Sequence, residues 1–174
     1  DLLLEGVLES IRVGRTAGPR VQISHLKGSG RRNWGLVRTA LDLMEYYRRL
    51  GVEVTCDVYP SAFAATSLYT LFPRWARRRG REGFLKLVAD PAQRARIARE
   101  MSRPSPEWEN ILYDAGFDGL RVAVSPALPE HLGRTIGEIA GERGENPMDT
   151  LFALAATDPD VEVIVAGMTE DDVR

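Results

Sequence analysis

The chain has 174 residues, enough for one domain with a sizeable core, and 44% of them are hydrophobic. A net charge of −2 gives no electrostatic reason to expect nucleic acid or a membrane surface as a partner. No apolar run approaches the roughly 20 residues that cross a bilayer, and no signal peptide opens the sequence. The single cysteine, Cys56, excludes an intramolecular disulfide, so we expect a cytoplasmic protein.

Residues 1–60 predict two consecutive helix–strand units. Apolar residues at helical spacing open the chain, and Gly18-Pro19 ends this first helix. A strand over 21–25 leads into a glycine-rich loop and a second helix over about 34–50. A second strand then covers 52–59. This order is typical of a parallel sheet with helical crossovers, whose strands are buried on both faces.

Residues 61–134 change in character and predict an α+β insertion. Residues 61–72 read as a loop leading into a short helix, and residues 73–88 as an irregular helix rich in arginine. A capped helix follows from Asp90-Pro91 to about Met101. Residues 110–113 and 120–124 read as two short strands. Arginines cluster between Trp75 and Arg81. A solvated helix end is their favoured interpretation, with a phosphate site as the alternative.

Residues 135–174 predict a return to helices and a strand. Thr135 and Glu138 fit a capping box, and Asn146-Pro147 opens a further helix. A strand over 161–166 follows, and Thr169 caps a helix that has just begun where the chain stops. Because the first residue also falls within a helix, we expect the chain to be a piece of a longer protein.

Polar residues stand at the ends of the first two predicted strands. His25 and Lys27 are two residues apart, so in an extended backbone their side chains point to the same side. Asp57 and Tyr59 end the next strand. Ligands of parallel α/β folds gather at these carboxyl ends. Taken singly, each residue also has a structural interpretation. His25 would hydrogen-bond a neighbour, and Lys27 would be a solvated surface charge. Asp57 would cap the backbone of its own loop, and Tyr59 would pack beneath the insertion.

The remaining reactive side chains do not complete a site. Cys56 is interpreted as a small core residue, and His131 as solvent-facing. A catalytic zinc needs about three protein ligands, and two histidines far apart in sequence do not supply them. Nucleophile-elbow, phosphate-loop and dinucleotide motifs are absent from the sequence. Most of any active centre is therefore expected to lie outside this chain.

Several motifs in order resemble one enzyme family. Gln22-Ile-Ser-His-Leu-Lys27, Asn33-Trp-Gly35 and Asp57-Val-Tyr-Pro60 resemble the N-acyl-D-amino-acid deacylases (D-aminoacylases) of the amidohydrolase superfamily. Pro73-Arg-Trp75, the Asp90-Pro91 helix and residues 163–173 extend the resemblance over nearly the whole chain.

The resemblance implies an α/β fold, a partial (β/α)8 barrel with parallel strands and crossover helices. Residues 1–60 would form two barrel units, 61–134 the α+β insertion, and 135–174 the return to the barrel. By the same resemblance, His25 matches a metal ligand and Lys27 a residue that binds the substrate carboxylate. Tyr59 matches a tyrosine that binds the substrate carboxylate or polarises the scissile carbonyl. The implied cofactor is zinc.

The departures from the family pattern are also informative. The family's other metal ligands would precede residue 1, and the aspartate that activates the water would follow residue 174. Ser61 stands where the family tends to have a second tyrosine. We expect the parent protein to hydrolyse N-acyl-D-amino acids to a D-amino acid and a carboxylic acid. The isolated chain is expected to be inactive and to bind zinc weakly.

Two other interpretations remain open. In the first, the parent protein is a cyclic-amide hydrolase related to the hydantoinases and dihydroorotases. In the second, which is a different class of function, the chain is a non-catalytic binding or assembly module on the same scaffold. Exposed strand edges also predict self-association.

Overall fold

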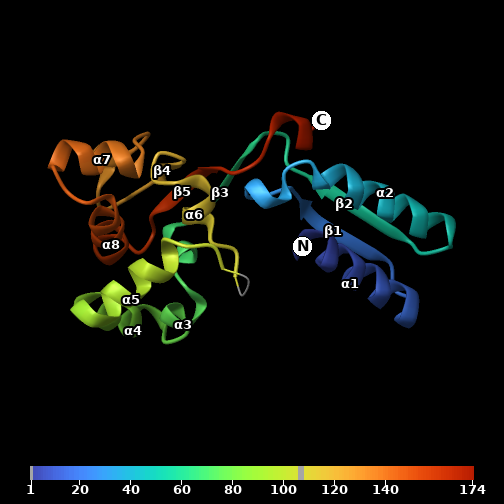
Figure 1. The fold of residues 1–174 in the computed structure, drawn as a ribbon, viewed down its shortest axis with the longest axis horizontal. Helices are drawn as coiled ribbons and strands as arrows, with labels where there is room; N and C mark the ends of the chain where they lie inside the picture. Colours follow the sequence, from blue (N-terminus) through green and yellow to red (C-terminus); the bar gives the residue numbers. More distant parts are fainter. Residues whose placement is uncertain (1, 106–107) are drawn as a thin grey trace. The chain divides into compact units, whose positions relative to one another are not determined.

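The computed structural model describes residues 2–105 and 108–174, which belong to two compact units (Figure 1). The first unit comprises the residues up to 63 together with 167–174, and the second unit comprises residues 64–166. The sequence predicted boundaries after residues 60 and 134 instead. The assignment of its three segments to a barrel and an insertion stays a prediction.

The first unit contains two helices and a two-stranded parallel sheet. Its elements are α1 (Leu2–Ala17), β1 (Val21–Leu26), α2 (Leu36–Arg49) and β2 (Val54–Val58). Val21 pairs with Val54 and Ile23 with Cys56 in the parallel register. The predicted order of helices and strands is therefore confirmed, with short 3-10 turns added at Arg31–Asn33 and Glu170–Asp172.

The core of the first unit lies on one face of this sheet. Helices α1 and α2 contact each other and bury apolar side chains against the strands. The buried members of this core are Val7, Ile11, Leu26, Val37, Ala40, Met44, Val52 and Val54. Gln22, Thr55 and Asp57, on alternate strand positions, are exposed. The prediction that both faces are buried is wrong for this unit, because its two helices share one side.

The second unit combines helices with a three-stranded sheet in the order β3-β5-β4. Strands β4 and β5 are antiparallel. Its elements are β3 (Phe63–Ser67), α3 (Arg74–Arg77), α4 (Gly80–Ala89), α5 (Pro91–Met101), α6 (Ile111–Ala115), β4 (Leu120–Val124), α7 (Ile136–Arg143), α8 (Pro147–Thr157) and β5 (Glu162–Ala166). The capping box of Thr135 and Glu138 is present, as predicted.

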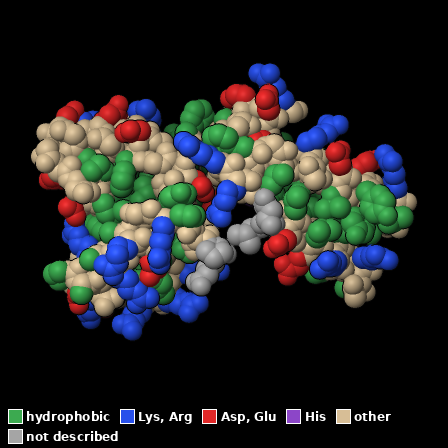
Figure 2. Space-filling view, in the orientation of Figure 1, with side chains coloured by type: hydrophobic (Ala, Val, Ile, Leu, Met, Phe, Trp, Pro, Cys, Tyr) green, Lys and Arg blue, Asp and Glu red, His purple; other side chains and the backbone are tan. Residues whose placement is uncertain are grey.

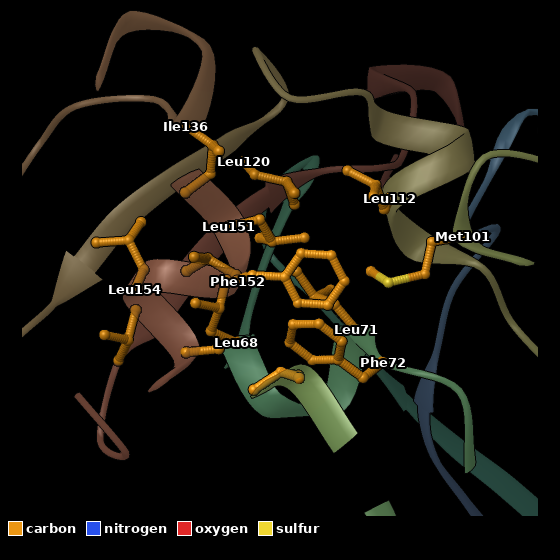
Figure 3. Close-up of a cluster of buried hydrophobic side chains, with 14 of the residues drawn as sticks. Leu68, Leu71, Phe72, Met101, Leu112, Leu120, Ile136, Leu151, Phe152 and Leu154 are labelled. Atoms are coloured by element: carbon orange, nitrogen blue, oxygen red, sulfur yellow. The ribbon is translucent and has the colours of Figure 1, made fainter. Parts of the chain in front are cut away.

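A large apolar core holds the second unit together (Figure 3). Phe72 is fully buried and contacts two other aromatic rings, Phe84 at 4.7 Å and Phe152 at 5.7 Å between centroids. Aromatic pairs of this kind contribute about 0.5–1.5 kcal/mol beyond the area they bury. Leucines and isoleucines from α7, α8 and β4 surround the rings. This core is independent of the core in the first unit.

Two segments differ in secondary structure from the sequence prediction. Residues 110–113 form the start of helix α6 instead of a strand, because the Asn110 side chain accepts a hydrogen bond from Tyr113 N–H and caps the helix. Residues 63–67, predicted as loop, form strand β3. The fold is a mixed α/β structure with a small parallel sheet and an antiparallel pair, and the described residues close no barrel.

None of the helices within residues 2–105 and 108–174 combines the length and apolarity that a membrane crossing requires.

Candidate functional site

The carboxyl end of β1 departs from extended geometry. Pairing with β2 shifts register between Ile23 and Leu26, and His25 within this irregularity has a φ of 59°. Left-handed backbone is uncommon outside glycine and is concentrated at turns and functional positions. The simple alternation that predicted a shared direction for His25 and Lys27 therefore does not apply, since Lys27 also lies beyond the strand.

Asp57 of β2 holds this irregular turn. Its Oδ1 accepts a 2.6 Å hydrogen bond from the His25 backbone N–H, and its Oδ2 accepts one of 3.1 Å from Gln22 Nε2. The His25 hydrogen bond lowers the pKa of the Asp57 carboxyl below its ordinary value. The structural interpretation of Asp57 from the sequence was a cap on its own loop, but the carboxylate caps the turn of the neighbouring strand. The carboxylate thereby sets the position of His25.

Tyr59 brings the two predicted strand-end residues together. The rings of His25 and Tyr59 have centroids 5.4 Å apart. Lys27 Nζ lies 5.2 Å from the Tyr59 ring centroid, and 3.5 Å from the His25 carbonyl oxygen. An imidazole, an ammonium and a phenol thus meet at one edge of the parallel sheet. The three residues that the resemblance selected are neighbours in space.

This arrangement suits the binding of a carboxylate. A cation over an aromatic ring at an exposed site is worth about 0.5–1 kcal/mol. A hydrogen bond between a charged pair contributes about 1.5–3 kcal/mol, so a carboxylate ligand would displace the ring as the partner of Lys27. Tyr59 is half-buried and keeps its hydroxyl as a further donor. The chemistry of the cluster is therefore anion recognition beside an imidazole.

The loop after β1 is fixed by the last residues of the first unit. Gly30 N–H and Trp34 Nε1 both donate to the Gly167 carbonyl, at 2.9 and 3.0 Å. The Asp172 carboxylate accepts from Gly35 N–H at 2.9 Å, at the start of α2. A carboxylate there also complements the helix dipole. Asp172 is a positioning residue that sequence reasoning missed, although it lies within a motif that carried the resemblance.

Gly28 is required where this loop is tightest. A Cβ at this residue would lie 2.8 Å from the Asn33 carbonyl oxygen and 3.3 Å from the Asp172 carboxylate. Since real Cβ atoms do not approach backbone that closely, only glycine fits without displacement. The glycine-rich stretch thus serves close packing of the loop that carries Lys27.

The described residues do not fit a complete zinc centre. They contain no group of three or more His, Cys, Asp or Glu side chains placed to hold a metal ion. His25 supplies one imidazole, while Asp57 is occupied by the backbone and Gln22. Burial and the nearby Asp57 charge raise the pKa of the Cys56 thiol, which disfavours the thiolate that binds metals. Cys56 packs against the core, as predicted.

The second histidine does not contribute to a metal group. His131 lies in the second unit and is only 5% exposed, so the prediction that it faces solvent is wrong. Its Nε2 lies 2.8 Å from Arg143 Nη2. Arginine only donates, so Nε2 is the acceptor and the imidazole is neutral. Burial, followed by the Arg143 charge, lowers the pKa of His131. This histidine has a structural role.

Among solved structures, the chain is similar to an N-acyl-D-glutamate deacylase from Bordetella bronchiseptica. That structure contains zinc and a phosphonate inhibitor that mimics the tetrahedral intermediate of its reaction. The match covers 99% of this chain and 27% of that one, with a TM-score of 0.64 and 25% identity. The chain is a structural relative of the D-aminoacylases.

Further D-aminoacylase structures share the fold. One described as defining a subset of amidohydrolases, and one used to study a binuclear metal centre, each match at a TM-score of 0.59 and 24% identity. The chain spans about 27% of the length of these D-aminoacylases. No protein-family model and no curated protein matches the sequence.

Proposed function

We propose that this chain forms the substrate-anchoring part of an amidohydrolase that acts on N-acyl-D-amino acids. The observation that carries the proposal is the cluster of His25, Lys27 and Tyr59 at the carboxyl edge of β1 and β2. The structural relationship to the N-acyl-D-glutamate deacylase supports the same substrate class. N-acyl-D-amino acids are amides that carry a free carboxylate beside the scissile bond.

Each residue of the cluster has a separate proposed role. Lys27 binds the substrate carboxylate as a point charge, and this contact orients the chiral carbon. Tyr59 donates its phenolic hydrogen to the substrate, at the carboxylate or the scissile carbonyl. His25 is proposed as one metal ligand, held in place by the hydrogen bond from its backbone to Asp57.

The rest of the metal centre is proposed to come from outside residues 1–174. For this reason we propose that the chain alone does not turn over substrate and binds zinc weakly. Metal analysis of the purified 174-residue chain after dialysis against zinc checks this. Tightly held zinc at one ion per chain would contradict the proposed division of the site.

Replacing Lys27 by methionine in the protein that contains this chain tests the anchoring role. We expect kcat/KM for an N-acyl-D-amino acid to fall by roughly 10- to 100-fold, since a charged hydrogen bond contributes about 1.5–3 kcal/mol. The sequence offers a matched control, because Lys86 is its only other lysine and is exposed on α4. Equal activities of the Lys27→Met and Lys86→Met variants would refute the proposal.

A substrate panel separates the proposal from the cyclic-amide alternative. N-acyl-D-amino acids carry the carboxylate that Lys27 is proposed to bind, whereas dihydrouracil and simple hydantoins lack one. We therefore expect turnover of the linear D-substrates, little of their L-enantiomers, and none of the uncharged rings. Preferential ring opening would favour a hydantoinase-like activity.

A further inference from the structure

A pocket lined by arginines lies in the second unit. It has a volume of about 590 Å³ and is lined by residues 73–75, 78, 96, 100, 103–105 and 108. Arg74, Arg78, Arg96 and Arg103 all contribute to its wall, and we call it the arginine pocket. Figure 2 shows Lys and Arg side chains gathered over the part of this unit that contains α3, α4 and α5. Pockets for small molecules have volumes of about 300–1,000 Å³.

One carboxylate in the arginine pocket is already occupied. Glu100 accepts a 2.7 Å hydrogen bond from Trp75 Nε1 and a 3.1 Å bond from Arg96 Nε. The Arg96 guanidinium also lies over the Trp75 ring, 4.1 Å from its centroid. These three side chains form a closed group in which one positive and one negative charge balance. This group gives the pocket a fixed wall.

The other three guanidinium groups of the pocket have no carboxylate partner among the described residues. Within the described part of the chain, Arg74, Arg78 and Arg103 form no ion pair and no side-chain hydrogen bond. They come from two separate segments, one at α3 and one after α5, and converge on a single hollow. This convergence favours an anion site. Of the basic cluster between Trp75 and Arg81, Arg78 lines the hollow, whereas Arg77 and Arg81 donate hydrogen bonds to backbone carbonyls.

The chemistry of the ligand follows from these groups. A guanidinium presents a planar fork of donors that matches the oxygens of a phosphate or carboxylate, often in pairs. Three unpaired guanidinium groups around one hollow are neutralised only by a ligand with more than one negative charge. Pro73 and Trp108 add apolar wall beside them. The net charge of −2 for the whole chain argues against a long polyanion such as nucleic acid.

We propose that the arginine pocket binds a small molecule that carries a multiply charged oxyanion, as a phosphate ester or a polycarboxylate, with an apolar or aromatic body. The oxyanion lies among Arg74, Arg78 and Arg103, and the body lies against Trp108. Binding removes the mutual repulsion of the three cations, so the ligand stabilises the second unit. The proposal does not depend on deacylase activity.

Calorimetric titration of the 174-residue chain at constant ionic strength tests the pocket. Phenyl phosphate and citrate are the two charged probes, and phenol is the uncharged control. We expect saturable binding at one site, with one of the charged probes preferred, and no binding of phenol. Tighter binding of phenyl phosphate than of inorganic phosphate would show the contribution of the aromatic wall. Absence of saturable binding for both charged probes would overturn the proposal.

Matched arginine variants locate the binding site. Arg74→Gln and Arg103→Gln remove one unpaired guanidinium from each segment, and both side chains are exposed, so the fold tolerates them. Each is expected to weaken binding by about tenfold or more, the loss of one charged hydrogen bond. Arg99→Gln, an exposed arginine of α5 outside the pocket, is the control and should bind as the original chain does. Equal weakening by all three changes would indicate nonspecific charge attraction and refute the site.

Discussion

The left-handed backbone at His25 makes a measurable prediction about stability. Its φ of 59° lies in the region where residues other than glycine, asparagine and aspartate pay about 1–2 kcal/mol. Asparagine tolerates this conformation, whereas a β-branched residue is a genuine outlier there. Both His25→Asn and His25→Val remove the imidazole and its contact with Tyr59, while both keep the backbone N–H that donates to Asp57. Their difference therefore isolates the backbone conformation.

We expect His25→Val to be about 1–2 kcal/mol less stable than His25→Asn. Urea unfolding followed by circular dichroism gives the free energies, and amide hydrogen exchange of β1 and β2 assigns the change to the first unit. The second measurement matters because two compact units need not unfold together. If the two variants agree within about 0.5 kcal/mol, the turn is not held in the left-handed region and the reasoning fails.

Three further predictions concern positions with distinct physical constraints. Gly28→Ala should disorder the loop after β1, because its Cβ would meet the Asn33 carbonyl; faster amide exchange at Gly30 checks this. Asp158→Ala should lower the free energy of unfolding by roughly 3 kcal/mol, because this buried carboxylate accepts hydrogen bonds from Ser125 Oγ and two backbone N–H groups. Asp158→Asn should lower it less, and the urea midpoints of the two variants compare them. His131 has a lowered folded pKa, so the unfolded state binds more protons just below its ordinary value of 6.5. Stability should therefore fall more steeply as the pH drops below 6.5 in the original chain than in His131→Gln, and identical pH profiles would exclude a buried neutral imidazole.

The helices were predictable because their starting signals are local. Asp90, Thr135 and Asn146 each accept a hydrogen bond from a backbone N–H within three residues of the chain, as their positions in the sequence indicated. Asn110 carries the same signal, but the apolar run that follows it was read as a strand. Strand β3 was missed because its small residues show no alternation, and its position depends on a distant partner, β5.

The proximity of the candidate site residues could be expected from the sequence, but their geometry could not. The strand ends indicated His25, Lys27 and Tyr59, and the resemblance suggested their roles. Their actual neighbourhood depends on the register between β1 and β2, which sequence spacing does not reveal. The hydrogen bond from His25 to Asp57 joins positions 32 apart, and the one from Gly35 to Asp172 joins positions 137 apart. Contacts at such separations leave no periodic pattern along the chain.

The chain leaves the first unit after residue 63 and re-enters it at residue 167. Met168 N–H donates to the Ala62 carbonyl at 3.3 Å, so the two crossing points are adjacent. The second unit therefore behaves as a closed loop of continuous sequence with its own core, and it can fold as soon as it is synthesised.

The first unit, in contrast, cannot form its contacts with Gly167 and Asp172 until the whole intervening segment has been made. Forming these contacts has the entropic cost of closing the intervening loop, and this cost grows only slowly with loop length. Folding of the second unit fixes the segment before closure and lowers this entropy. A deletion that joins residue 63 to residue 167 through a short glycine linker would remove the delay altogether. The order of synthesis thus makes the loop that carries Lys27 among the last parts of the chain to become ordered.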